Sequence, residues 1–303
     1  MAILVDKKTR ALIQGITGKE GLRALEGMKN YGTKVLAGVT PGKGGQYANG
    51  VPVYDTVSEA IRRHPSINTS LIAVPAIAVK DAALEAMHCK IPFLNVLAEH
   101  VPVGDTAMIF AWAKKSGARV VGPSSIGIIS PGVGKIGSIG GSDPKKIFRP
   151  GSVGVISKSG GMAAEISMAL SHAGIGQSTV LGIGGDQIIG SDFVDIIKLF
   201  KNDPKTRAVV VFGEVGGTYE EQLADFVKKE KFKKPIVAMI VGKFTANLQL
   251  GTTLGHAGAI VMKGLGGYES KIKSLKRAGV MVANTLDEIP ALLKSKFRGK
   301  IGL

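Results

Sequence analysis

Residues 254–260 (Leu-Gly-His-Ala-Gly-Ala-Ile) set one histidine among small and apolar neighbours. The imidazole of His256 can act as a base, a ligand or a nucleophile. Small neighbours would let a bulky group, such as a phosphoryl group on a ring nitrogen, approach closely. Taken alone, a glycine-rich turn with a structural histidine is the simpler interpretation. The chemistry of His256 therefore depends on whether the chain supplies sites for phosphate and carboxylate groups elsewhere.

Two glycine turns in the same half of the chain could complete such a site. Ser159, Gly160 and Gly161 precede a helical stretch at 163–172, which places backbone N–H groups and a helix dipole beside a ligand. Glu214, in the turn 213–217, could accept the imidazole N–H and select the tautomer. A buried salt bridge or a helix cap is the competing interpretation of Glu214, and the residues alone slightly favour it.

The other four histidines give no comparable signal. They lack similar surroundings, and no two of them have the spacing of metal ligands, so we assign them to packing and predict no metal site. They are His64, His88, His100 and His172.

A further anion site is predicted near the N-terminus. Gly15, Gly18 and Gly21 are spaced by three residues between a strand at 10–15 and a helix at 22–31, although this is not the dinucleotide motif G-x-G-x-x-G. An NAD site also needs an acid at the end of the next strand. The chain has Lys43 there instead, in a loop of glycine and proline, which suits a phosphorylated ribose. A solvated loop lysine is an equally good interpretation, but an NAD-dependent oxidoreductase is disfavoured.

Alternating apolar runs and helical stretches must position these turns, and they predict an α/β protein with parallel, doubly wound sheets. Because 303 residues can bury two ordinary cores, we expect a Rossmann-like domain at 1–122, a linker at 123–151 and a flavodoxin-like domain at 152–303. The predicted strands cover 10–15, 34–39, 70–75, 92–99, 119–122, 152–157, 179–183, 208–212, 235–241 and 280–283.

Composition excludes several other classes. The net charge is +16, but the basic residues are scattered and aromatics make up only 5%, so we expect an anionic ligand and an acidic partner rather than nucleic acid. No run approaches 18 apolar residues, and the N-terminus has no signal-like apolar core, so no membrane association is expected. Cys89 is the only cysteine, which favours a reducing compartment and a cytoplasmic location.

Five glycine-containing motifs carry a resemblance to a known family. They are Gly15-Ile16-Thr17-Gly18-Lys19-Glu20-Gly21, Pro41-Gly42-Lys43-Gly44-Gly45, Gly182-Ile183-Gly184-Gly185-Asp186, Gly213-Glu214-Val215-Gly216-Gly217 and Gly255-His256-Ala257-Gly258-Ala259. With these motifs the chain resembles, over nearly all of its length, the α subunits of succinyl-CoA synthetases and the corresponding part of ATP-citrate lyases. In that family the first domain binds CoA, and a histidine carries a phosphoryl group taken from a nucleotide on a β-type ATP-grasp partner.

The resemblance implies a role for each matching residue. His256 would be the phosphocarrier, Glu214 its partner and Glu99 a further catalytic residue near the acyl group. The turn Ser159, Gly160 and Gly161 would hold phosphate and substrate. ATP and Mg²⁺ would bind to the partner subunit of a hetero-oligomer, and the 3′-phosphate of CoA would account for Lys43. The implied CoA contacts are Thr17, Gly18, Lys19, Glu20, Lys43, Val74, Pro75, Leu97, Ala98 and Glu99.

Sequence differences between members of this family indicate which acid is the substrate. Succinyl-CoA synthetases usually read Ser-Gly-Thr-Leu followed by a tyrosine, whereas this chain reads Ser159-Gly160-Gly161-Met162 with Ala164 in the tyrosine's place, as ATP-citrate lyases do. Gly161 would leave room for a larger and more anionic acid. Because the sequence ends at Leu303 without an ATP-grasp or lyase module, we expect the small subunit of a citryl-CoA synthetase, which converts citrate, CoA and ATP to citryl-CoA, ADP and phosphate. The alternatives are a succinyl-CoA synthetase α subunit and a non-catalytic CoA-binding regulatory module.

Overall fold

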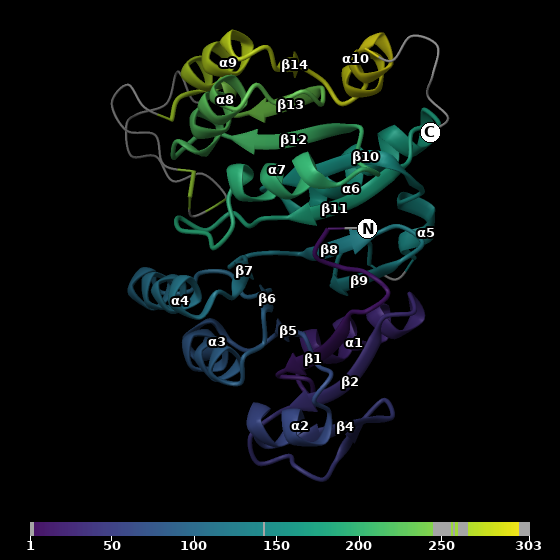
Figure 1. Ribbon diagram of the computed structural model, residues 1–303, viewed down its shortest axis with the longest axis vertical. Helices are drawn as coiled ribbons and strands as arrows, with labels where there is room; N and C mark the ends of the chain where they lie inside the picture. Colours follow the sequence, from purple (N-terminus) through teal and green to yellow (C-terminus); the bar gives the residue numbers. More distant parts are fainter. Residues whose placement is uncertain (1–2, 142, 245–255, 257, 260–265, 297–303) are drawn as a thin grey trace.

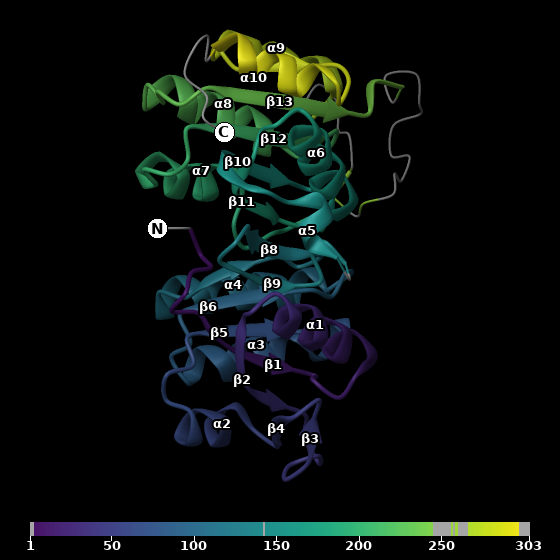
Figure 2. The same ribbon diagram turned by 90° about the vertical axis from the view of Figure 1, so that its right-hand side faces the viewer.

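The computed structural model describes residues 3–141, 143–244, 256, 258–259 and 266–296. Two seven-stranded sheets follow one another along the long axis of the molecule (Figures 1 and 2). The first sheet belongs to the N-terminal half, drawn in purple and blue, and the second to the C-terminal half, drawn in teal, green and yellow. The α/β class expected from the alternating sequence pattern is confirmed.

The first sheet has the strand order β3-β4-β2-β1-β5-β6-β7, which is the Rossmann order with a short antiparallel strand, β3, added at one edge. Its alternate residues face opposite layers: Ile13 packs with α1, whereas Leu12 packs with α2, α3 and α4. The strands are β1 (Arg10–Gln14), β2 (Lys34–Val39), β3 (Tyr47–Ala48), β4 (Val51–Tyr54), β5 (Thr69–Ile72), β6 (Phe93–Val96) and β7 (Arg119–Val121). The helices are α1 (Lys19–Asn30), α2 (Val57–Arg63), η1 (Ala76–Ala78), α3 (Val79–His88) and α4 (Val103–Ser116).

The second sheet has the order β14-β13-β12-β10-β11-β8-β9, in which β10 to β14 are parallel and follow the flavodoxin order. Val209 and Val211 face α7, α8 and α9, whereas Val210 faces α6 and α10. The strands are β8 (Gly127–Ser130), β9 (Gly134–Gly137), β10 (Pro150–Ser157), β11 (Gln177–Gly182), β12 (Ala208–Glu214), β13 (Ile236–Val241) and β14 (Met281–Ala283). The helices are α5 (Pro144–Ile147), α6 (Gly160–His172), α7 (Phe193–Asn202), α8 (Tyr219–Lys229), α9 (Tyr268–Arg277) and α10 (Glu288–Lys296).

The predicted linker at 123–151 is not a plain connection. It contains α5 and the hairpin β8–β9, and β8 pairs antiparallel with β11 to extend the second sheet. Both strands are buried on both faces, so they lack the polar alternation that marks a half-exposed strand. Gly127 shows why the segment is rich in glycine: a Cβ there would lie 2.1 Å from the carbonyl oxygen of Ile136 on the neighbouring strand.

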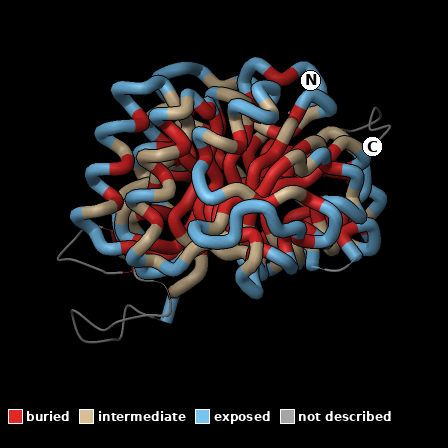
Figure 3. Tube along the Cα trace, turned by 90° about the horizontal axis from the view of Figure 1, so that it is seen from below, coloured by how far each residue is buried: buried red, intermediate tan, exposed pale blue. Residues whose placement is uncertain are grey.

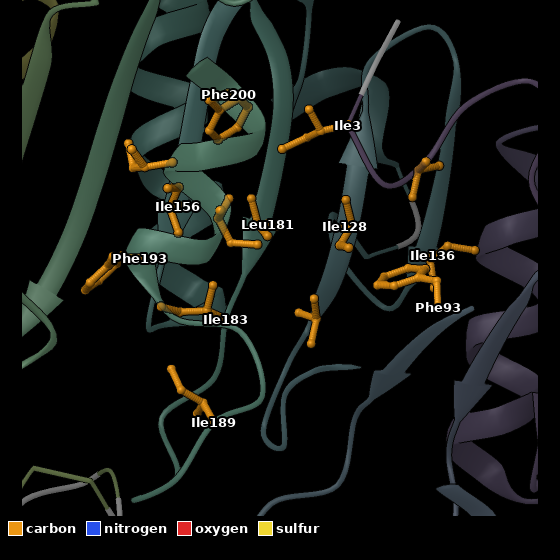
Figure 4. Packing of buried hydrophobic residues seen from close by; sticks show 14 of the residues in the cluster. Ile3, Phe93, Ile128, Ile136, Ile156, Leu181, Ile183, Ile189, Phe193 and Phe200 are labelled. Atoms are coloured by element: carbon orange, nitrogen blue, oxygen red, sulfur yellow. The ribbon is translucent and has the colours of Figure 1, made fainter. Parts of the chain in front are cut away.

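A shared core joins the two domains. Phe93 of the first sheet belongs to the same buried cluster as Ile128 and Ile136 of the hairpin, and the cluster continues through Leu181 to Phe193 of α7 (Figure 4). Viewed along the molecule, buried chain fills the centre and exposed chain surrounds it (Figure 3). Continuous packing of this kind fixes the relative position of the two sheets, and with it any site built between them.

Within the described ranges, no helix is both long and apolar enough to cross a membrane.

Candidate active site

The carboxyl ends of β1, β5 and β6 in the first domain and of β10 in the second meet at one cavity of about 750 Å³. Ligands of open α/β sheets bind at this edge of a sheet, and here two such edges share one space. The cavity is lined by Gly18, Lys19, Glu20, Ala73, Val74, Pro75, Leu97, Ala98, Glu99, Ser124, Ser125, Ile126, Ser138, Lys158, Ser159, Gly160, Gly161 and His256.

The first-domain wall is a tight strand-to-helix turn. Gly15 has a φ of +80°, and a Cβ there would lie 2.6 Å from the carbonyl oxygen of Ala73. A Cβ on Gly21 would lie 2.2 Å from the carbonyl oxygen of Gly15, so side chains are excluded at both positions. Gly18 precedes α1 without a side-chain cap. The first amide groups of α1 therefore stay available for an anionic ligand, as the glycine spacing predicts.

Two predicted contact residues are not on the cavity wall. The hydroxyl of Thr17 donates to that of Thr40 (3.2 Å) rather than lining the cavity. Lys43 is exposed, in a turn closed by its own N–H on the carbonyl of Thr40 (3.0 Å) and by the bond from the Gly44 N–H to Asp55 (2.9 Å). Lys43 can therefore meet only a part of a ligand that extends beyond the enclosed space.

The second-domain wall is the turn between β10 and α6. Ser159 caps α6 by accepting the N–H of Met162 (3.4 Å), and the Ser157 hydroxyl donates to the carbonyl of Ser159 (2.5 Å). A Cβ on Gly160 would lie 2.8 Å from the side chain of Ile126, whereas a Cβ on Gly161 would have nothing within 4 Å. Packing thus requires a glycine at 160, while the glycine at 161 leaves open space on the exposed side of the helix N-terminus.

His256 and Glu214 form the predicted pair. Nδ1 of His256 and Oε2 of Glu214 are 2.7 Å apart, and the other carboxylate oxygen lies 3.5 Å from the Nζ of Lys158. The side chains of Glu214 and Lys158 are 9% and 2% exposed, whereas that of His256 is 33% exposed. An ionised carboxylate can only accept, so Nδ1 carries a proton, and in the neutral ring Nε2 keeps its lone pair.

The charges of this group favour that arrangement. Burial favours the neutral form of Glu214, but the hydrogen bond from His256 and the charge of Lys158 outweigh it and hold the pKa of Glu214 below its ordinary value. The hydrogen bond to Glu214 raises the pKa of His256 above its ordinary value, against partial burial and the nearby Lys158. Glu214 is therefore an anion at neutral pH and fixes the orientation of the ring.

A third turn supports the imidazole and links the domains. A Cβ on Gly185 would lie 2.6 Å from Cγ of His256, and the Gly258 N–H donates to the carbonyl of Gly185 (2.9 Å). The neighbouring Asp186 accepts the backbone N–H groups of His100 and Val101, each at 3.3 Å. The turn that packs on His256 is thus tied to the end of the segment that carries Glu99.

The structure brings most of the predicted residues together. All of the CoA contacts implied by the resemblance line the large cavity apart from Thr17 and Lys43, and so do the Ser159 turn and His256. Glu214 lies behind the imidazole and lines a smaller cavity of about 340 Å³ that His256 also borders. Leu254, Gly255, Ala257 and Ile260 lie outside the described residues.

Sequence reasoning missed two members of the site. Lys158 was visible beside the predicted Ser159 turn, but its ion pair with a residue 56 positions away has no local signal. Asp186 was visible in a glycine motif, but its acceptor role depends on the other domain. No group of three or more histidine, cysteine or acidic side chains that could hold a metal ion occurs among the residues placed by the structure.

Each of the two domains matches a known protein family. Residues 6–100 match the CoA binding domain family, and residues 156–281 match the CoA-ligase family. The fold and the site thus define an acid–CoA ligase chain, with its cavity between a CoA-binding domain and a ligase domain.

The chain belongs to the family of the α subunits of ADP-forming succinate–CoA ligases. It is 46% identical over 293 residues to α subunit 2 from Archaeoglobus fulgidus, covering 97% of this chain and 99% of that subunit. It is 42% identical over 301 residues to the α subunit from Methanothermobacter thermautotrophicus, covering 99% of this chain and 98% of that one.

Solved structures of ATP citrate lyase share the whole architecture. A variant from Methanosaeta concilii in complex with (3S)-citryl-CoA has a TM-score of 0.90 at 25% identity, and the lyase from Methanothrix soehngenii in complex with citrate and coenzyme A has a TM-score of 0.88 at 25% identity. Each match covers 99% of this chain but only 53% and 52% of the lyase chains. The chain therefore corresponds to about half of an ATP citrate lyase chain.

Proposed function

We propose that the chain is the α-type subunit of an ADP-forming acid–CoA ligase in which His256 carries a phosphoryl group from a nucleotide to an acid. The observation that carries this proposal is the imidazole held by Glu214, with its second nitrogen available, on the wall of a cavity that also contains a helix N-terminus. Binding of CoA alone requires neither His256 nor Glu214, which argues against a non-catalytic CoA-binding module.

The geometry supports a three-step reaction. First, Nε2 of His256 bonds to the γ-phosphorus of ATP while the bond from that phosphorus to the bridging oxygen breaks, and ADP leaves. The proton on Nδ1 stays in its hydrogen bond to Glu214, which stabilises the positive charge that develops on the ring. The N–H groups at the start of α6, after Ser159, are placed to hold the phosphoryl oxygens.

In the second step a carboxylate oxygen of the acid bonds to phosphorus and the N–P bond breaks, which restores neutral His256 and yields an acyl phosphate. In the third step the thiol sulfur of CoA bonds to the acyl carbon while the bond from that carbon to the phosphate oxygen breaks, so that a thioester forms and inorganic phosphate leaves with the thiol proton. Glu99, exposed on the first-domain wall near His256, has its proposed role at this acyl end. A shared cavity lets both transfers occur without release of the acyl phosphate.

The residues of the first-domain wall suit CoA chemically, in agreement with the match of this domain to the CoA binding domain family. The amide groups at the start of α1 suit its pyrophosphate, and Val74, Pro75 and Leu97 offer apolar surface to the rest of the molecule. Lys43 lies outside this wall, on the exposed loop after β2. Its proposed ligand is therefore the 3′-phosphate at the far end of CoA.

Replacing Lys43 with alanine should weaken CoA binding about three- to tenfold, because an exposed cation contributes roughly 1 kcal/mol to a charged contact. The measurement is calorimetric titration with CoA and with 3′-dephospho-CoA. The variant should bind dephospho-CoA as the unchanged chain does. Equal weakening toward both ligands would place Lys43 away from the 3′-phosphate.

The nucleotide and its Mg²⁺ are assigned to a β-type ATP-grasp subunit. The named relatives are α subunits of a ligase, which supports a second kind of subunit. His256 borders a second, smaller cavity that is lined by residues of the second domain alone, and an imidazole placed between two spaces suits transfer between a nucleotide on a partner and an acid in this chain.

The relatives favour succinate as the acid. The named α subunits that are 46% and 42% identical over nearly the whole chain belong to succinate–CoA ligases, and this outweighs the citrate expected from the turn at Ser159. Two observations favour citrate as the second candidate. Gly161 leaves open space beside the helix N-terminus, and the structural relatives with citrate or citryl-CoA are also similar over the whole chain.

An acid panel separates the two candidates. The chain, reconstituted with its ATP-grasp partner, ATP and CoA, should turn over succinate with a higher kcat/KM than citrate. Gly161→Thr should leave succinate turnover within about threefold, since the new side chain enters open space, and should reduce any citrate turnover more strongly. A higher kcat/KM for citrate, lost in Gly161→Thr, would reverse the assignment.

A further inference from the structure

A buried ion pair lies directly behind Glu214. Lys271 of α9 and Glu220 of α8 are in contact, and both side chains are 0% exposed. Nζ of Lys271 also donates to Glu221 (3.1 Å) and to the carbonyl of Gly217 (3.0 Å). Burial of charge is costly, and replacing a buried pair with apolar residues often leaves stability unchanged or improves it. Stability alone is therefore a weak reason for this pair.

The pair is bonded to the segment that presents Glu214. While one oxygen of Glu220 meets Lys271, the other accepts the backbone N–H of Glu214 at 3.2 Å. A Cβ on Gly213 would lie 2.5 Å from that same oxygen, so the chain must carry glycine where it passes the carboxylate. The far end of the turn is held as well, by the bond from Lys271 to the carbonyl of Gly217. Glu220 and Lys271 thus form hydrogen bonds with the first and the last residue of the turn 214–217.

We propose that Glu220 is a positioning residue for the phosphocarrier: its carboxylate, whose buried charge Lys271 balances, holds the backbone of Glu214 so that the Glu214 carboxylate meets Nδ1 of His256. This inference rests on the proposed function, because it assigns a purpose to the network within that site. The two residues touch neither the substrate nor the transferred phosphoryl group. Their effect is transmitted through one backbone bond to Glu214 and from Glu214 to the ring.

The carboxylate of Glu214 must be placed accurately, which gives the buried ion pair a purpose despite its cost. The carboxylate of Glu214 must satisfy a 2.7 Å bond to His256 and a 3.5 Å ion pair with Lys158 at the same time. Displacement of a reacting group by about 1 Å can cost on the order of 100-fold in rate. Glu214 is the last residue of β12, where the pairing with β13 continues at Val241 but the pairing with β10 has ended at Phe212. The buried carboxylate of Glu220 supplies an acceptor for the backbone N–H of Glu214 at this strand end.

The chain offers a matched set of variants. Glu220→Ala removes both the ion pair and the acceptor for the Glu214 N–H. Glu221→Gln removes a charge from the same lysine but leaves that acceptor in place. The double variant Glu220→Gln/Lys271→Met removes the buried charges while keeping a carbonyl acceptor at position 220. If the role of Glu220 were only structural, the defects would appear in every variant that loses a buried charge. If Glu220 positions Glu214, the defects should appear only where the acceptor for the Glu214 N–H is lost.

The first readout is independent of catalysis. In the full chain, NMR titration of the histidine ring nitrogens, with His256 assigned by His256→Asn, should show a raised pKa and a proton on Nδ1. Glu220→Ala should shift the pKa of His256 toward the ordinary value of about 6.5. Glu221→Gln and the double variant should retain the raised pKa. If Glu220→Ala does not fold, the double variant and Glu221→Gln carry the test, and a lost shift in the double variant contradicts the proposal.

The second readout is the rate of His256 phosphorylation by ATP in the complex with the partner. Glu220→Ala should slow it on the order of 100-fold with CoA affinity unchanged, and the double variant should restore most of the rate. An unchanged rate and ring pKa in folded Glu220→Ala would overturn the inference. If the unchanged chain is not phosphorylated at all, the proposed function fails, whereas the ring titration still decides the positioning role.

Discussion

Replacing His256 with asparagine should reduce acid–CoA ligase turnover on the order of 10⁴-fold or more, because the covalent carrier of the phosphoryl group is lost. The CoA wall is built by the first domain from the ends of β1, β5 and β6, so the Kd for CoA should stay within about twofold. Turnover with the partner, ATP, CoA and succinate measures the first effect, and calorimetric titration with CoA measures the second.

His88→Asn is the matched control, since His88 lies on α3 with its Nδ1 on the carbonyl of Leu84 (2.8 Å) and its ring against Trp112. It should leave turnover unchanged. If His256→Asn retained a tenth of the normal rate, the phosphoryl group would have to reach the acid directly, without the enzyme as a carrier.

Glu214→Gln should lower the phosphorylation rate by about 10²- to 10⁴-fold, because a neutral amide can turn its NH₂ toward Nδ1 and allow the wrong tautomer. The pKa of His256 should fall as well, since the bond to Glu214 is the main cause of its elevation. Neutral imidazole is the reactive form. The rate of the unchanged enzyme should therefore rise with pH through the elevated pKa of His256, above about 6.5.

In Glu214→Gln the rising limb of that profile should move to lower pH while the plateau drops. Single-turnover phosphorylation at a series of pH values gives both quantities. Glu221→Gln, which removes a carboxylate from the following helix, α8, should change neither the plateau nor the limb. A plateau within about threefold of the unchanged enzyme in Glu214→Gln would mean that the carboxylate does not set the tautomer.

The sequence predicted the features that depend on local pattern. Apolar runs located the parallel strands of both sheets apart from β4, and the turns at Gly15 and Ser159 do lie at helix N-termini on one cavity. These signals are local because strand, turn and helix start follow one another in the chain. The hairpin β8–β9 escaped prediction because its short strands are buried on both faces and rich in glycine.

Features that depend on contacts between distant residues could not be predicted. Lys158 and Lys271 look like ordinary lysines in the sequence, yet one faces Glu214 and the other is buried against Glu220. Asp186 gives no local hint that it will accept backbone N–H groups from the other domain. Lys43 is exposed on the turn after β2, and its contact with the 3′-phosphate of CoA stays a prediction.

The central claim is that the phosphoryl group passes through His256. Its most direct measurement is mass spectrometry of the chain after brief incubation with the partner and Mg·ATP, followed by peptide mapping and a chase with succinate and CoA. The account predicts an acid-labile phosphoryl group on the peptide that contains His256, which disappears in the chase as fast as thioester forms. A chain that forms thioester at the full rate while no phosphoryl group, or one on another residue, is found would contradict it.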